Sequence, residues 1–252
     1  MRPTAAMGHP QLAIGASAVS PAVMPAAQSA RGPACLDLHL DRPVCTISER
    51  LESVLEVQMS VAPPVATSPA RRRILSTASG LFYARGLRAV GVDTIIAESG
   101  VAKATFYKHF PAKDDLIIAH LDIVDEVWSG QLHDAARAAG ARPADQLVGL
   151  FDALDTACRR DGYRGCGFIN AAAEAPAGTP VHDRTVAHKR AVLSWMTDLA
   201  RRAGADDPAR LARSLSLLLD GALASGALDA DPEAAAVART TAAQLVAAAI
   251  PR

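Results

Sequence analysis

Apolar side chains recur three and four residues apart over most of the chain after residue 68, which is the spacing of one buried face of an α-helix. The first stripe runs from Ile74 to Phe82 and predicts a helix that begins after the capping hydroxyl of Ser68 and ends at Gly86. Half of the 252 residues are hydrophobic, alanine is abundant, and no convincing alternating run marks a strand, so we predict an all-α protein. Further stripes predict helices over residues 92–99, 102–109, 144–160, 168–175, 181–203, 208–224 and 232–250, and a long helix that opens at Pro111.

The stretch of residues 91–110 predicts two short helices joined by a tight turn. In the first helix Val92, Ile95 and Ile96 share one face, and Gly100 behind it suits the left-handed conformation that often ends a helix. A helix with a basic, hydroxyl-bearing face, braced at an angle by a short partner, is typical of a helix-turn-helix that reads the DNA major groove. The second helix has Val101, Phe106 and Phe110 on its apolar side, and Lys103, Thr105, Tyr107, Lys108 and His109 on the other.

Residues 1–68 differ from the rest in carrying eight prolines together with scattered glycine and serine. This composition predicts a disordered N-terminal extension rather than a packed domain. Within it, residues 47–59 have the spacing of one short helix. Two alternatives are an arm that touches DNA or a partner, and a natural start at Met59 instead of Met1.

The formal net charge is zero, but the charge is unevenly distributed. Residues 69–118 carry eight basic and four acidic side chains, a difference of +4, whereas residues 119–252 carry 14 basic and 17 acidic ones, a difference of −3. This asymmetry is expected of a protein that holds phosphates with one end only. We find no run apolar enough to span a membrane and no compact apolar core of a signal peptide, and therefore expect a cytoplasmic protein without a membrane partner.

Residues 69–129 resemble the DNA-binding domain of the TetR family of bacterial transcriptional regulators. The resemblance implies an N-terminal three-helix domain with its helix-turn-helix at residues 91–110, a long connecting helix, and a helical regulatory and dimerisation domain over residues 130–252. One departure is Gly91, where the family often has serine or threonine, and Thr94 can supply the phosphate contact instead. The matching positions are Leu81, Phe82, Gly86, Ile95, Gly100, Val101, Thr105, Tyr107, His109, Phe110, Lys113 and Leu116.

Side chains at the entry of the second short helix are expected to meet base edges. Lys103 can donate to guanine and Ala104 can meet a thymine methyl. The alternative for Tyr107 and His109 is packing within the domain. The predicted DNA contacts are Thr94, Lys103, Ala104, Thr105, Tyr107, Lys108, His109 and Lys113.

The last two predicted helices are apolar around much of their circumference, and in TetR-like proteins such a pair forms the homodimer interface. A dimer would place two reading helices on a palindromic double-stranded operator, and an unknown small-molecule effector would release a repressor of this kind. The apolar helices suggest an uncharged, hydrophobic effector, and no cofactor or metal is expected. The candidate pocket residues are Trp128, Phe151, Tyr163, Cys166, Phe168, Asn170, His188 and Trp195.

Two other functions are compatible with the cysteines, none of which forms a CxxC pair. The first is a thiol-based redox regulator in which Cys158 and Cys166 meet across a loop and neighbouring arginines lower a thiol pKa. The second is an enzyme with Cys166 as nucleophile and His182 or His188 as base, although no motif around Cys166 supports it. We therefore predict that the protein is not an enzyme.

Overall fold

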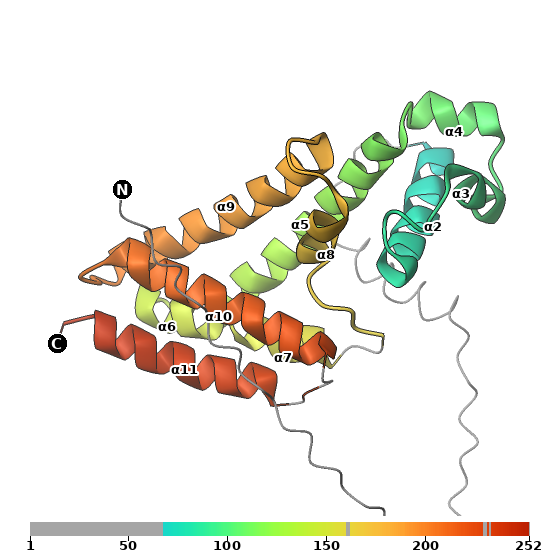
Figure 1. Cartoon of the computed structure of the whole chain (residues 1–252). Coiled ribbons are helices and arrows are strands. Elements are labelled where there is room, and N and C mark those ends of the chain that lie inside the picture. The colour runs from blue at the N-terminus through green and yellow to red at the C-terminus, as the bar shows by residue number, and fades with distance from the viewer. Residues whose placement is uncertain (1–67, 160–161, 229–230, 232, 252) are drawn as a thin grey trace, which may run out of the picture. The chain divides into compact units, whose positions relative to one another are not determined.

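The computed structural model describes residues 68–159, 162–228, 231 and 233–251, and all regular elements in these residues are helices (Figure 1), which confirms the predicted all-α class. The expectations for residues 1–67, including the short helix at 47–59, lie outside the described residues. The helices are α2 (Pro69–Arg85), α3 (Val92–Ser99), α4 (Lys103–His109), α5 (Lys113–Ala138), α6 (Pro143–Gly149), α7 (Asp152–Cys158), α8 (Gly167–Glu174), α9 (Pro180–Arg202), α10 (Pro208–Leu228) and α11 (Ala234–Ala249).

Helices α2, α3 and α4 and the first third of α5 pack together, and we call this part, residues 68–121, the head. The predicted caps are in place: Ser68 Oγ accepts a hydrogen bond from the Arg71 amide, and Gly100 adopts the left-handed conformation with φ of 65°. The apolar core of the head is completed by Phe168 and Ala171 of α8 and by Val181 of α9. The head therefore shares its apolar core with α8 and α9, which belong to the remaining part of the described chain, the body.

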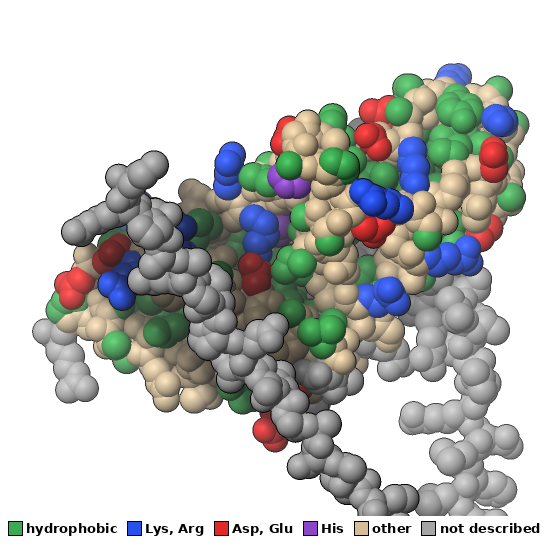
Figure 2. All heavy atoms as spheres, in the orientation of Figure 1, with side chains coloured by type: hydrophobic (Ala, Val, Ile, Leu, Met, Phe, Trp, Pro, Cys, Tyr) green, Lys and Arg blue, Asp and Glu red, His purple; other side chains and the backbone are tan. Residues whose placement is uncertain are grey.

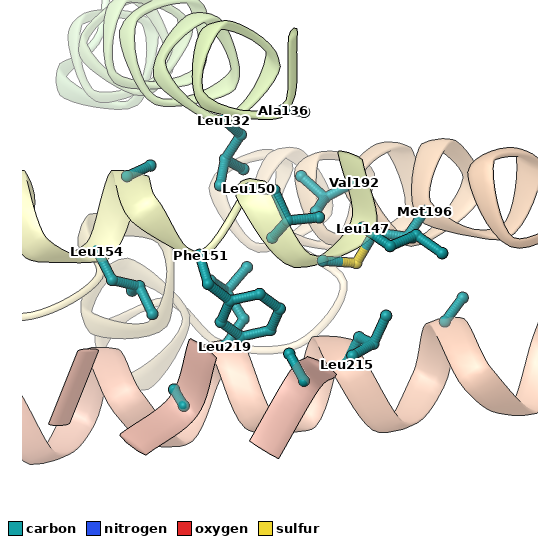
Figure 3. Packing of buried hydrophobic residues seen from close by; sticks show 14 of the residues in the cluster. Leu132, Ala136, Leu147, Leu150, Phe151, Leu154, Val192, Met196, Leu215 and Leu219 are labelled. Atoms are coloured by element: carbon teal, nitrogen blue, oxygen red, sulfur yellow. The ribbon is translucent and has the colours of Figure 1, made fainter. Parts of the chain in front are cut away.

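The body, residues 122–251, is organised around α5, which Figure 1 shows running from the head towards α6 and α7. Side chains from α5, α6, α7, α9 and α10 meet in one apolar core, seen from close by in Figure 3. Leu147, Leu150 and Leu154 are fully buried there, and so is Met196 of α9. Burying aliphatic side chains of this size is worth roughly 1.5–3 kcal/mol each, so this core is the main source of the body's stability.

The prediction of one continuous helix over residues 144–160 is wrong, because the chain forms α6 and α7 instead. At the break the amides of Phe151, Ala153 and Leu154 bond to carbonyls three residues back, the tighter pattern of a 3₁₀ turn. Gly149 lies against the end of α5, where an added Cβ would come within 2.2 Å of the Ala139 Cβ. The break thus accompanies a close approach of two helices that periodicity cannot reveal.

The expectation that no run could span a membrane also needs correction. Among the described residues, α10 is long and apolar enough to do so by length and composition. Its inner face, including Leu215, Leu219 and Leu223, is buried against the other body helices, as in the core helix of a soluble protein. Packing therefore accounts for the apolar residues on the inner face of α10.

Candidate nucleic-acid interface

Helix α4 has two chemically different sides. Phe106 and the following Phe110 are buried in the head core. On the opposite side four predicted contact residues are exposed and Thr105 is half-exposed, so the short helix offers cations, a methyl group and hydroxyls to a partner. The four exposed residues are Lys103, Ala104, Tyr107 and Lys108.

Aromatic packing fixes the orientation of this surface. Phe106 meets the ring of Phe110 at a centroid distance of 6.2 Å and that of Tyr107 edge-on at 5.3 Å. The Tyr107 side chain remains 43% exposed, so its ring braces the helix while part of it stays accessible. The guanidinium of Arg71, the first of three consecutive arginines in α2, stacks over the ring of Phe110 at 4.9 Å from the ring centre. Arg71 therefore lies beside the C-terminal end of α4.

Lys103 at the start of α4 is paired only loosely. Its Nζ lies 3.4 Å from Oδ1 of Asp93, and the two side chains are 67% and 88% exposed. Exposed pairs of this kind contribute at most about 1 kcal/mol, so the ammonium can exchange its partner for a base or a phosphate. Thr94 is half-buried one turn into α3, behind the Gly91 cap.

Two predicted DNA contacts are engaged inside the head. His109 Nε2 shares a hydrogen bond of 3.0 Å with Ser68 Oγ, the hydroxyl that caps α2. Lys113 Nζ donates to the Leu87 carbonyl at 2.6 Å and so ties the start of α5 to the loop after α2. An ammonium has three N–H donors, so this bond leaves Lys113 two further N–H groups for a phosphate. The hydrogen bond of His109 to Ser68 is compatible with the packing alternative for this residue.

The loop after α2 is also held from the body, by a residue that the sequence did not single out. The carboxylate of Glu174, at the end of α8, accepts hydrogen bonds from the amides of Leu87 at 3.0 Å and Arg88 at 2.7 Å. Arg88 Nε donates in return to the Glu174 backbone carbonyl at 2.8 Å. Gly86 makes this approach feasible, since it has φ of 87° and an added Cβ would lie 2.8 Å from Glu174 Oε1.

We refer to the contacts of Glu174 with Leu87 and Arg88 as the Glu174 clamp. Its partners are separated by more than 80 positions in the chain, so no local sequence signal could have found it. It joins the head to α8, the same helix that contributes Phe168 to the head core.

The head has a net positive charge, but its basic and acidic side chains are interspersed. Figure 2 shows Lys and Arg side chains alternating with acidic ones over the face that it presents. Several carboxylates have partners within the head: Glu98 pairs with Arg85 at 3.5 Å, and Asp115 accepts from the Ala112 amide at the start of α5. The excess of four basic residues is therefore spread over the head and does not form one uniform patch.

The candidate pocket residues are divided between the two cores and the surface. Trp128, Phe151, Tyr163, Cys166 and Trp195 pack in or against the body core, and Phe168 lies in the head core. His188 stacks on Phe168 at 3.7 Å with nearly parallel rings, and its Nδ1 is 2.7 Å from Asp125. Asn170 is exposed and lines a cleft between head and body.

His188 belongs to a polar cluster that joins α5 to α9. Although burial acts to raise it, the pKa of Asp125 is lowered by hydrogen bonds from Arg184, Ser129 and His188. Burial lowers the pKa of His188 despite its carboxylate partner. This imidazole is stacked on Phe168 and bonded to Asp125, and among the described residues no hydrogen bond joins it to Cys158 or Cys166.

The predicted lowering of a thiol pKa is not observed. Burial raises the pKa of Cys158 and of Cys166, and both are free thiols. The guanidinium of Arg159, one of the arginines expected to activate a thiol, instead pairs with Asp155 at 2.7 Å. Both thiols thus have the character of packing residues and lack the lowered pKa of a reactive thiolate.

Comparison with known proteins agrees with this geometry. Residues 74–120 match the family profile described as bacterial regulatory proteins, tetR family. The chain is 37% identical to SCO4454, a TetR-family transcriptional regulator from Streptomyces coelicolor, and the two structures align with a TM-score of 0.67 over 72% of this chain and 96% of that one.

Two curated relatives are also regulators. The HTH-type transcriptional regulator YjdC of Escherichia coli is 25% identical over 158 residues, covering 61% of this chain and 81% of that protein. The HTH-type transcriptional repressor KstR2 of Mycolicibacterium smegmatis is 31% identical over 94 residues, covering 36% of this chain and 45% of that protein. These relatives regulate transcription and are not enzymes.

Proposed function

Since the chain belongs to the TetR family of DNA-binding transcriptional regulators, we propose that it is a cytoplasmic repressor that binds a palindromic operator as a homodimer and is released by a small molecule. In this proposal residues 69–129 form the DNA-binding domain and residues 130–252 the regulatory and dimerisation domain. The observation that carries the proposal is the exposed side of α4, opposite the buried Phe106 and Phe110.

On the DNA, Lys103 and Ala104 at the N-terminal end of α4 read base edges, because this end of a recognition helix enters the major groove. Thr94, Thr105, Tyr107 and Lys108 contact phosphates, which fix the register of the protein on the duplex. Lys113 adds a phosphate contact while holding Leu87, and His109 supports α4 from behind.

Dimer formation is supported by the outer faces of α10 and α11. Leu217, Gly221, Ala224 and Leu228 are exposed and lie along one side of α10 at helical spacing. Leu217 is 69% and Leu228 82% exposed, and Val237 of α11 is 59% exposed. Exposed apolar stripes of this kind on adjacent helices favour burial against a second copy of the chain.

Release by a small molecule requires that the ligand and the operator prefer different arrangements of the head. Helix α5 extends from the head through the body, so a shift of its body half would change the separation of the two reading helices in a dimer.

The test is operator binding by Lys103→Ala, measured by fluorescence anisotropy with the intergenic DNA beside the gene. We expect a loss of about 1–3 kcal/mol of specific binding and relaxed discrimination at one base pair. Asp93→Asn is the matched control, because it breaks the same ion pair without removing the donor. Equal affinity of Lys103→Ala and the wild type would contradict the assignment of α4, and an equal loss in Asp93→Asn would assign the effect to the pair.

A further inference from the structure

A cleft of about 310 Å³ opens between the head and the body. Its walls come from α2, the loop after it, α5, the loop before α8, and α8 itself. The volume lies at the lower end of the range for small-molecule sites, which suits a ligand of one or two rings. None of the core aromatics of the body lines it, so it is distinct from the packed interior of Figure 3.

Part of the cleft wall is apolar and uncharged. Phe82 and Leu87 keep 3% and 8% of their surface exposed, and the half-buried Tyr83 adds aromatic surface. His120 also lines it, and burial lowers the pKa of this imidazole to about 4, so it is neutral at physiological pH. Its Nδ1 shares a hydrogen bond of 3.0 Å with Ser79, which satisfies one ring nitrogen inside the head.

The outer part of the cleft carries a cation on a fixed backbone. The Arg164 amide donates to the Tyr83 hydroxyl at 2.8 Å, and the Arg164 carbonyl accepts from Asn170 Nδ2 at 2.8 Å. The side chain of Arg164 is exposed at the rim, and among the described residues no carboxylate pairs with its guanidinium. Among the described residues that line the cleft, Glu174 is the one acidic residue, and it already accepts two amide hydrogen bonds in its clamp.

We propose that this cleft binds a small aromatic or aliphatic carboxylate, whose apolar part lies against Phe82 and Tyr83 and whose carboxylate pairs with Arg164. A guanidinium suits this role because its N–H groups match the two oxygens of a carboxylate. A second negative charge on the ligand would be repelled by Glu174, which also lines the cleft. This chemistry differs from the uncharged effector that composition alone suggested.

A ligand in the cleft would touch the head through Phe82 and Tyr83 and the body through α8. Its effect on DNA binding rests on the proposed function, whereas binding itself does not. Because Glu174 lines the same cleft, a bound ligand changes the surroundings of the Glu174 clamp, which holds the loop after α2. Ligand binding is therefore coupled to the position of the head.

The probe for this site is 4-(trifluoromethyl)benzoate, followed by ¹⁹F NMR with the full chain in the absence of DNA, and its neutral counterpart is 4-(trifluoromethyl)benzamide. Two variants report on the two parts of the cleft. Arg164→Gln removes the cation, and Ala173→Trp fills the opening from an exposed position of α8 without disturbing the core. Arg190→Gln, an exposed arginine of α9 outside the cleft, is the matched control.

We expect wild type and Arg190→Gln to bind the benzoate alike. Arg164→Gln should weaken the benzoate about three- to fivefold but the benzamide little, because the guanidinium is exposed, and Ala173→Trp should abolish binding of both probes. A wild-type dissociation constant above about 10 mM, or undiminished binding in folded Ala173→Trp, would overturn the site. Undiminished benzoate binding in Arg164→Gln would overturn the carboxylate assignment.

Operator binding is measured separately with and without saturating benzoate. A change in operator affinity that Ala173→Trp removes supports the coupling, and an unchanged affinity with the probe bound refutes it. Failure of the unliganded protein to bind any operator would refute the proposed function and leave the ligand site standing, so the two failures are distinguishable.

Discussion

Replacing Glu174 by alanine removes the clamp between the body and the loop after α2. The carboxylate accepts from the Leu87 and Arg88 amides at 3.0 and 2.7 Å, the first partly buried and the second exposed. A hydrogen bond to a charged group is worth about 1.5–3 kcal/mol when protected, and solvent screens the exposed one, so the two together should contribute about 2 kcal/mol. Glu174→Ala should lower the free energy of unfolding by that amount.

The assay is urea unfolding followed by circular dichroism, at one fixed protein concentration so that the proposed dimer would contribute equally to all variants. Asp198→Ala is the control, because this carboxylate also has two partners, Arg201 at 3.2 Å and Arg202 at 3.0 Å. All three side chains are exposed and belong to the same helix, α9. It should cost below about 1 kcal/mol. If Glu174→Ala costs no more than Asp198→Ala, the clamp contributes nothing beyond an ordinary surface pair and the reasoning is refuted.

Three further results are expected. Burial lowers the pKa of His120 from 6.5 to about 4, so between these values the unfolded chain binds a proton that the folded chain does not, and the free energy of unfolding falls as the pH drops below about 6.5. Between pH 7 and pH 5, urea titrations should show a loss of free energy of unfolding that is about 2 kcal/mol larger for the wild type than for His120→Gln. Gly149→Ala should cost at least about 2 kcal/mol by thermal unfolding, because its Cβ would lie 2.2 Å from that of Ala139, and a smaller loss would show that α6 can move away. Cys158→Ser combined with Cys166→Ser should leave the peroxide response of operator binding unchanged, and a response that disappears in the double variant would restore the redox interpretation.

Local signals predicted the head well. The caps at Ser68 and Gly100 and the bounds of α3 depend on neighbouring residues, and the structure has them where the pattern placed them. The exposed side of α4 likewise follows from the spacing of Phe106 and Phe110.

Features that depend on distant contacts escaped prediction. The break between α6 and α7 accompanies the packing of Gly149 on α5, and the Glu174 clamp joins segments that no periodicity relates. His109 and Lys113 match the family motif, yet their observed partners are Ser68 and Leu87. The aromatic residues proposed for a pocket pack in or against the cores. A sequence shows which side chains are apolar but not where space is left between them.

The exposed apolar stripe on α10, with Leu217 and Leu228 at its ends, has a consequence for gene dosage. In the proposed dimer this stripe is covered by the second copy. When the cellular concentration of the chain is below the dissociation constant of the dimer, the concentration of dimer grows with the square of the concentration of the chain. A doubling of expression then raises the concentration of dimer about fourfold. Small changes in expression would then alter operator occupancy steeply. Noise in synthesis would be amplified in the same proportion, and substitutions such as Leu217→Lys would shift the expression level at which regulation sets in while leaving the DNA-reading surface intact.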